Sequence, residues 1–310
     1  MADHTPSNVP PVGEIRAPGM DHAHHPYRTL PDAPHFTWPD GARMAFTVTI
    51  MLDHWELVPP PEGNPDPRIV SPLGKFFPDW LTWSHRLYGA RVGIFRLLRV
   101  LDEFSLTPSV ALGAEAAKRY PELVDECLRR NACFMAHGTH ASRRITSKMT
   151  EAEERAFIAE SSAAVHAATG TDPRGWCGQD FNQSARTPAL LAESGFGYTM
   201  DWANDDRPFL LGPYAGKSLL ALPPQPEWND LESMGLRRVP AQTWANNIVE
   251  AFRFMHDEGG ASFNLTLHPF VAGQAHRIRY LHEALTQVLG RGKTWRTTTD
   301  DVAACARTQL

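Results

Sequence analysis

Residues 132–140 read ACFMAHGTH, a short apolar run followed at once by two histidines with Gly-Thr between them. The apolar run predicts a buried β-strand. In parallel α/β proteins, the loops after the carboxyl ends of the strands build the pocket. We therefore expect His137 and His140 to face a functional site, and the first question is whether they bind a metal ion.

The rest of the chain surrounds this segment with alternating strands and helices. Residues 45–52 (AFTVTIML) are rich in β-branched side chains, which is typical of a buried strand. Thr150 and Glu153 form a capping box that predicts the start of a long helix. Further strands are predicted at 106–112, 131–136, 175–177, 197–200, 219–222 and 261–267, and helices at 92–104, 121–130, 150–168, 187–194, 244–256 and 275–289. This alternation predicts a parallel α/β architecture, either a barrel or an open sheet.

The composition is ordinary for a globular protein: 310 residues, 42% of them hydrophobic and 21% charged, with a net charge of −5. No basic tract indicates nucleic-acid binding, and no apolar run is long enough to span a bilayer. The N-terminal residues lack the apolar core of a secretory signal, and the four cysteines show no CxxC spacing. We therefore expect a cytoplasmic protein with no nucleic-acid or membrane partner.

The chain divides into an arm and a body. Residues 1–40 are rich in Pro, His and Asp and show no periodicity, which predicts an extended N-terminal arm. Residues 41–310 are predicted to form a single barrel domain. Arms of this kind often order against a neighbouring subunit, so we expect a homo-oligomer. Residues 59–78 form a long Pro/Gly-rich loop, which suggests a lid.

Titratable or amide side chains follow several of the predicted strands. They are Asp53 and His54 after the first strand, His137 and His140 after the third, Asp201, Asn204, Asp205 and Asp206 after the strand near Tyr198, and His268 after 261–267. Burying polar groups costs free energy unless something satisfies or uses them, so their convergence favours a shared site. Simpler roles remain open: Asp201 and Asp205 could cap the turn before Pro208, and His140 could face solvent.

Aromatic residues add two more possibilities. Trp202 and Trp228 could line a pocket or fill the core, since either place can supply a partner for the indole N–H. Asn229 and Asp230, directly after Trp228, could supply polar contacts to the N–H and C=O groups of a ring or belong to a loop turn. Histidines 22, 24 and 25 resemble a metal-binding tract, but they lie in the irregular arm, and we do not favour them as a ligand set.

Several segments together resemble the polysaccharide deacetylase (NodB-homology) superfamily, and within it the branch of metal-independent allantoinases and cyclic imide hydrolases. The segments are LDHWE (52–56), YGARVGIFRL (88–97), AHGTH (136–140), PRGW (173–176), GFGY (195–198), DWANDDRP (201–208) and LHP (267–269). They spread over about residues 40–305. The resemblance implies a distorted (β/α)7-type barrel and hydrolysis of a non-peptide C–N bond.

The resemblance also implies roles for single residues. In the deacetylases an Asp-Asp pair supplies a base and a metal ligand, and Asp53 and His54 stand at these positions. His137 matches the first histidine of the deacetylase metal loop, but the second falls on Ala141, with His140 one position away. The arginine that tethers the base in deacetylases would fall near Cys177, where this chain has none. The positions that differ from the deacetylase pattern are therefore those that bind the metal ion or tether the base in sugar deacetylases.

The hypothesis we favour is hydrolysis of a small cyclic amide: an imide, a ureide such as allantoin, or a hydantoin-like ring. Asp53 is then the base for water, His268 the acid or oxyanion donor, and His137 a residue that orients the carbonyl. Candidate substrate-binding residues are His54, Trp55, Trp202, Asp205, Trp228 and Asn229. A strained imide has a good leaving group, so we expect no metal cofactor.

Three alternatives stay open. Zn²⁺ could be bound by His54, His137 and His140, because catalytic zinc sites favour three protein ligands and a water. A metal-dependent N-deacetylase of an amino sugar would use a related site. A non-catalytic binding protein could keep the barrel and its pocket.

Overall fold

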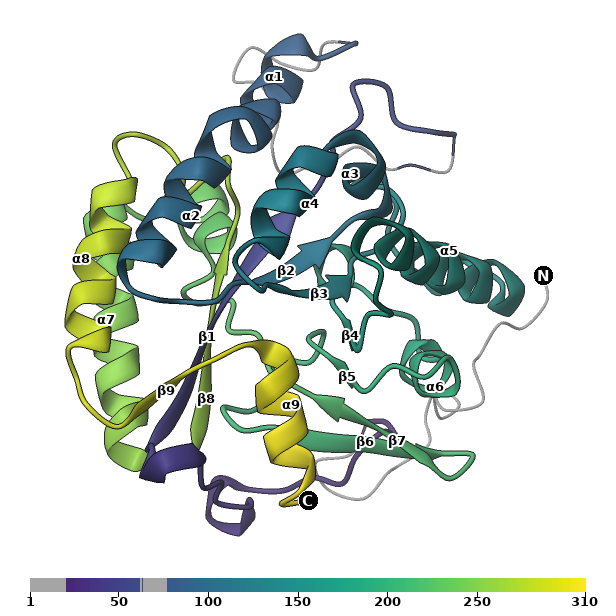
Figure 1. The fold of residues 1–310 in the computed structure, drawn as a ribbon. Helices are drawn as coiled ribbons and strands as arrows, with labels where there is room; N and C mark the ends of the chain where they lie inside the picture. The colour runs from purple at the N-terminus through teal and green to yellow at the C-terminus, as the bar shows by residue number, and fades with distance from the viewer. Residues whose placement is uncertain (1–20, 62, 64–76) are drawn as a thin grey trace.

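The computed structural model describes residues 21–61, 63 and 77–310 of the chain, which form one curled sheet surrounded by helices (Figure 1). The strands are β1 (Met44–Leu52), β2 (Ser109–Leu112), β3 (Cys133–Ala136), β4 (Gly175–Trp176), β5 (Tyr198–Thr199), β6 (Phe209–Tyr214), β7 (Lys217–Ala221), β8 (Ala261–Leu267) and β9 (Thr294–Arg296). The helices are α1 (Trp80–Tyr88), α2 (Ile94–Glu103), α3 (Ala114–Arg119), α4 (Pro121–Leu128), α5 (Glu151–Thr169), α6 (Thr187–Glu193), α7 (Ala241–Glu258), α8 (Ile278–Leu289) and α9 (Thr299–Arg307). Most of the predicted lid, and the first half of the predicted arm, lie outside the described residues.

Strand β1 confirms the predicted first strand and lies inside the sheet. All nine of its residues are buried, as expected for a strand covered on both faces. It pairs in parallel with both β2 and β8, so that Ile50 lies between Val110 and Leu267. The residues that follow β1 therefore emerge beside those that follow its two neighbours.

The strand order is β6-β7-β5-β4-β3-β2-β1-β8, with β9 paired to the start of β1. The pairs are parallel except for the antiparallel hairpin of β6 and β7. The loop before β6 returns to the start of β8, where Ser262 N–H donates to the carbonyl oxygen of Asp206 (3.0 Å). The two ends of the order thus approach each other, and the fold is the distorted (β/α) barrel that the resemblance implies.

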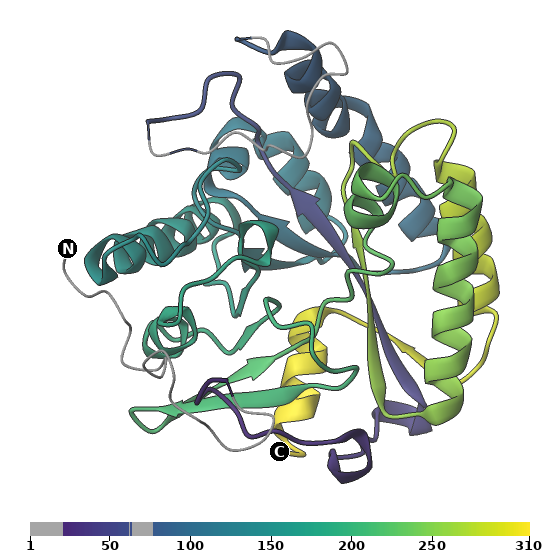
Figure 2. The ribbon, with the colours of Figure 1, turned by 180° about the vertical axis from the view of Figure 1, so that it is seen from behind.

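Helices cover the outside of the curled sheet. Helices α7 and α8 lie beside β1 and β8, and the view from behind shows the same pair along those strands (Figure 2). Helix α5 begins at the predicted capping box, in which Thr150 Oγ1 accepts from the Glu153 N–H and Glu153 reaches back to the Thr150 N–H. Among the described helices, none is both long and apolar enough to cross a membrane.

Glycines let the loop after β8 pack closely on the helical segment before α2. A Cβ atom on Gly93 would lie 2.0 Å from the carbonyl oxygen of Pro269, and one on Gly273 would lie 2.5 Å from Cα of Gly93. No other residue type fits at either position without moving the backbone. This contact fixes the loop that begins at His268.

The described part of the N-terminal arm packs against the body of its own chain. The buried His24 accepts the Gly212 N–H through its carbonyl oxygen (2.7 Å) and shares a hydrogen bond with the Tyr214 hydroxyl (2.7 Å). Further along, the buried Trp38 donates from Nε1 to the carbonyl oxygen of Ala261 (3.0 Å). The arm therefore continues into the core of the barrel domain.

Candidate active site

Asp53 and His137 form a buried pair at the carboxyl ends of β1 and β3. Asp53 follows β1 directly and His137 follows β3 directly. His137 Nε2 lies 3.3 Å from Asp53 Oδ2, and the two side chains are only 1% and 9% exposed. The parallel strands thus bring together two residues that are 84 positions apart, as the sequence predicted.

Hydrogen bonds fix both members of this pair. His137 Nδ1 donates to the carbonyl oxygen of Cys177 (2.5 Å), so its other ring nitrogen is the one that faces Asp53. Gln179 Nε2 donates to Asp53 Oδ1 (2.7 Å) and to the carbonyl oxygen of His137 (2.7 Å). The ring and the carboxylate are therefore held by the segment that follows β4.

The electrostatics of the pair favour the charged form of both groups. Burial lowers the pKa of His137, but the Asp53 carboxylate, with a smaller contribution from Cys177, outweighs burial and holds that pKa well above the ordinary imidazole value. Burial raises the pKa of Asp53, but His137, the Gln179 hydrogen bond and His268 together bring it below its ordinary value. The charged forms of the two groups therefore stabilise each other.

His268 is oriented by a buried aspartate. It follows β8, and its Nδ1 donates to Asp230 Oδ1 (2.6 Å). Asp230 is fully buried and also accepts the backbone N–H groups of His268 and Ala272. The carboxylate thus fixes the tautomer of His268 and leaves Nε2 as the nitrogen that can exchange a proton.

A narrow cleft joins these two centres. Asp53, His137 and His268 line it together with Gln179, and its remaining lining residues are Met51, Trp55, Asp180, Phe181, Asn229, Leu231 and Glu232. Its volume is about 20 Å³, which is enough for a water molecule. The arrangement can therefore hold a water between a carboxylate base and a histidine.

Trp55 and Asn229 lie at this cleft, as predicted. The Arg86 guanidinium stacks on the Trp55 indole, with its carbon 3.6 Å from the ring centroid. Asn229 Oδ1 accepts the N–H groups of Leu231 and Glu232, so its side chain holds the turn that follows. Both predicted roles of Asn229, in a turn and at the site, are compatible with this position.

The other predicted metal ligands do not gather around His137. His54 Nδ1 shares a hydrogen bond with the Tyr120 hydroxyl (2.7 Å), and His140 Nδ1 shares one with Thr139 Oγ1 (3.1 Å). Within the described ranges, no three His, Cys, Asp or Glu side chains are placed so that they could share a metal ion. The set of His54, His137 and His140 therefore does not fit a Zn²⁺ site here.

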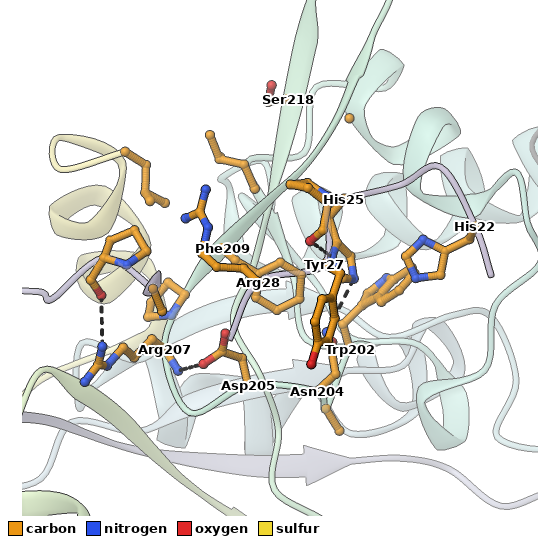
Figure 3. A pocket seen from close by; sticks show the side chains of 18 of the residues that line it. His22, His25, Tyr27, Arg28, Trp202, Asn204, Asp205, Arg207, Phe209 and Ser218 are labelled. Atoms are coloured by element: carbon orange, nitrogen blue, oxygen red, sulfur yellow. Dashed lines mark hydrogen bonds between the residues drawn. The ribbon is translucent and has the colours of Figure 1, made fainter. Parts of the chain in front are cut away.

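Two predicted substrate-binding residues line a different cavity. Trp202 and Asp205 lie at a cavity of about 830 Å³ between the N-terminal arm and the loop before β6 (Figure 3). Trp202 is surrounded there by the rings of His22 and His25, at centroid distances of 5.2 and 5.5 Å. A contact between this cavity and the substrate stays a prediction.

Trp228 fills the core, which was the simpler of its two predicted roles. It stacks on Phe263 at a centroid distance of 4.6 Å, and its Nε1 donates to the carbonyl oxygen of Asn264 (3.0 Å). Only 7% of the residue is exposed. Its neighbours Asn229 and Asp230, rather than its own ring, connect this segment to the cleft.

Three buried polar residues near the site have contacts that the sequence analysis did not predict. It did not name Gln179, and it gave Asp230 as a possible ligand contact and Asp201 as a possible turn cap. Gln179 and Asp230 contact Asp53 and His268 directly, as described above. Asp201 accepts the Gly178 N–H through Oδ1 (2.7 Å), and burial raises the pKa of its carboxyl group to about 7. Gln179 stands just after the predicted strand 175–177, so the rule that found Asp53 and His137 would also have found Gln179 if it had been applied to that strand.

Comparisons with known proteins agree with this fold. No protein-family model matches the chain, and no curated protein matches it. A structure from Mycobacterium smegmatis assigned as a polysaccharide deacetylase is 26% identical, with a TM-score of 0.77 over 89% of this chain and 94% of that one. PuuE allantoinase is 22% identical, with a TM-score of 0.78 over 89% of this chain and 94% of its own. A Pseudomonas aeruginosa PAO1 protein, also assigned as a polysaccharide deacetylase, is 23% identical, with a TM-score of 0.78 over 90% of this chain and 95% of its own. The predicted resemblance is thus confirmed for the fold.

Proposed function

We propose that this protein is a hydrolase of non-peptide C–N bonds that opens a small cyclic amide, such as an imide, a ureide or a hydantoin-like ring. The observation that carries the proposal is the cleft shared by the Asp53–His137 pair and the His268–Asp230 pair. The likeness to deacetylases and to an allantoinase supports a C–N hydrolase. Ring opening is the more specific part of the proposal, because it states which C–N bond is broken.

The reaction begins with water in the cleft. Asp53 accepts a proton from this water as its oxygen attacks the ring carbonyl carbon, which yields a tetrahedral oxyanion. Each carboxylate oxygen accepts more than one hydrogen bond, so Asp53 can bind water while Gln179 and His137 hold it. His137 keeps the carboxylate ionised, and its predicted contact with the carbonyl stays part of the proposal.

The ring C–N bond then breaks. The oxyanion collapses to a carboxylic acid, and the leaving nitrogen takes a proton from His268 Nε2. Asp230, bonded to Nδ1, stabilises the positive charge that His268 carries before this transfer. The acid product and the protonated Asp53 release their protons, and His268 regains one.

The volume of the cleft is relevant to how a substrate ring enters it. The described cleft has a volume of about 20 Å³, which suits a water molecule, and we propose that a lining side chain moves to admit a ring. Trp55 is only partly buried and forms part of two further narrow clefts, which suits it to this role. We propose that a flat ring displaces Trp55 and lies against the indole.

The observed histidine arrangement favours this reaction over metal-dependent N-deacetylation. That alternative needs a set of metal ligands, and His54 and His140 point to other partners. We therefore propose catalysis without a resident metal. We also propose a homo-oligomer, in which the neighbouring Trp80 and Leu81 of α1, 60% and 64% exposed, form part of the contact between subunits.

A substrate panel tests the proposed function. Purified protein is offered succinimide, phthalimide, hydantoin, dihydrouracil and allantoin, and loss of ring absorbance or appearance of product is followed. Turnover of at least one ring, resistant to a chelator and without stoichiometric zinc, is the expected result. Turnover of an acetylated chito-oligomer instead of every ring, or loss of activity together with zinc, would overturn it.

A further inference from the structure

Gln179 contacts both members of the buried Asp53–His137 pair. It lies in the short turn Gln179–Phe181 after β4 and is only 5% exposed. Its Nε2 group donates to Asp53 Oδ1 and to the carbonyl oxygen of His137, each at 2.7 Å. A carboxylate and a carbonyl oxygen can only accept, so the two hydrogen bonds determine which end of the amide faces them.

The surrounding glycines leave room for this contact. A Cβ atom on Gly113 would lie 3.0 Å from Asp53 Oδ1, and one on Gly138 would lie 3.2 Å from Gln179 Cγ. Gly138 also has φ +75°, a conformation that favours glycine. The carboxylate and the amide can therefore approach each other from strand ends that a larger residue would hold apart.

The amide supplies the shorter of the two contacts on the carboxylate. Gln179 Nε2 lies 2.7 Å from Oδ1, whereas His137 Nε2 lies 3.3 Å from Oδ2. The terminal torsion of an aspartate is broad, so one long contact does not fix the plane of the carboxylate. With both contacts, Oδ1 and Oδ2 of Asp53 each have a partner, so the plane of the carboxylate is fixed. The lone pairs that face the cleft then keep their direction.

We propose that Gln179 is the positioning residue of Asp53: it sets the plane of the carboxylate from which water is activated. This inference rests on the proposed role of Asp53 as the base. It assigns Gln179 no contact with the substrate, so loss of the amide acts on the chemical step. A base displaced by about 1 Å slows a reaction by about 10²-fold.

Two variants distinguish the effect of the amide donor from the effect of the length of the side chain. Gln179→Met keeps a similar length and has no donor, and Gln179→Asn keeps the amide but is one methylene too short to reach both acceptors. Both are measured on the ring that the wild-type protein opens fastest. We expect kcat to fall about 10²-fold in Gln179→Met, with KM changed by less than about threefold. In Gln179→Asn, kcat should fall less than in Gln179→Met, because the shorter side chain keeps an amide that can donate to one acceptor.

The control is Gln242→Met, the same substitution on the exposed face of α7, where Gln242 donates to Asn246. It should leave kcat and KM unchanged. A crystal structure of Gln179→Met gives a second readout that needs no activity, and we expect the Asp53 carboxylate to be rotated. Unchanged kcat, a loss confined to KM, or an unrotated carboxylate would each overturn the inference.

This design distinguishes failure of the inference from failure of the proposed function. If the wild-type protein opens no ring but deacetylates a chito-oligomer, ring opening is wrong, and the Gln179 variants are compared on the chito-oligomer instead. If the wild-type protein turns over neither a ring nor the chito-oligomer, the inference is tested by the crystal structure of Gln179→Met alone. A carboxylate in its wild-type orientation then removes the positioning role.

Discussion

Asp53 carries the proposed chemistry at the residue scale. Its oxygens contact His137 and Gln179, and it shares a cleft with His268. Asp53→Asn keeps the shape of the side chain and removes its basicity. We expect kcat to fall by about 10² to 10⁴-fold, the usual contribution of a general base.

This prediction is checked by steady-state kinetics together with thermal unfolding. The unfolding curve should show that Asp53→Asn is folded at the assay temperature. Wild-type turnover in a folded Asp53→Asn protein would assign the base to another residue.

Asp201 provides a pH-dependent test. Burial raises the pKa of its carboxyl group from 3.8 to about 7, and Oδ2 has no hydrogen-bond partner in the described structure. The folded state therefore binds more protons than the unfolded state between these pH values, and the stability contributed by this group falls as the pH rises through that window. Asp201→Asn keeps an acceptor for Gly178 N–H and removes the charge.

The expected result is a stability difference between Asp201→Asn and wild type that grows in favour of the variant as the pH rises from about 4 to 7, and is constant above that. Urea unfolding at a series of pH values measures it. A difference that does not change with pH would show that the Asp201 carboxyl group titrates as it does in the unfolded chain.

At the scale of the elements, the sequence predicted those with strong local patterns. The strands β1, β3 and β8 are apolar runs of the right length, and α5 has a capping box and a terminal glycine, Gly170. Strand β6 was missed because it contains Gly212 and Pro213, which interrupt any alternating pattern. Its pairing with β7 comes from the hairpin and not from its own composition.

The contact between Gly93 and the loop after β8 gives a prediction at this scale. Gly93→Ala places a methyl group 2.0 Å from the Pro269 carbonyl oxygen, so the helix and the loop must separate. We expect a loss of about 1–3 kcal/mol in unfolding free energy, with reduced kcat because His268 begins that loop. Chemical denaturation and kinetics of the same preparation measure both effects.

Gly292→Ala is the matched control, since a Cβ atom there meets nothing within 4 Å and no positive φ strains it. It should be close to wild type in both measurements. If Gly93→Ala behaves like Gly292→Ala, the close approach does not constrain the site.

At the scale of the whole molecule, the arm is a structural part of the barrel domain. Phe36 and Trp38 stack at a centroid distance of 5.5 Å, and both are almost fully buried. Trp38 also bonds the carbonyl oxygen of Ala261, the first residue of β8. We expect Trp38→Ala to lower the unfolding free energy by about 3–5 kcal/mol, because it leaves a large cavity.

Leu30→Ala serves as the control within the arm, since Leu30 is 50% exposed and should change stability by less than about 0.5 kcal/mol. Equal effects of the two substitutions would mean that the arm does not contribute to the core. Guanidinium unfolding followed by fluorescence measures both variants.

The sequence alone determined the fold class, the main strands and the candidates Asp53, His137 and His268. Each depends on local patterns: apolar runs of strand length, and polar groups placed where such runs end. Only the tertiary structure showed that Gln179 and Asp230 hold these residues, that Trp228 belongs to the core, and that Trp202 and Asp205 line another cavity. The physical reason is that a hydrogen-bond partner or a packing neighbour is set by the register of strands far apart in the chain, and side-chain type does not encode that register locally.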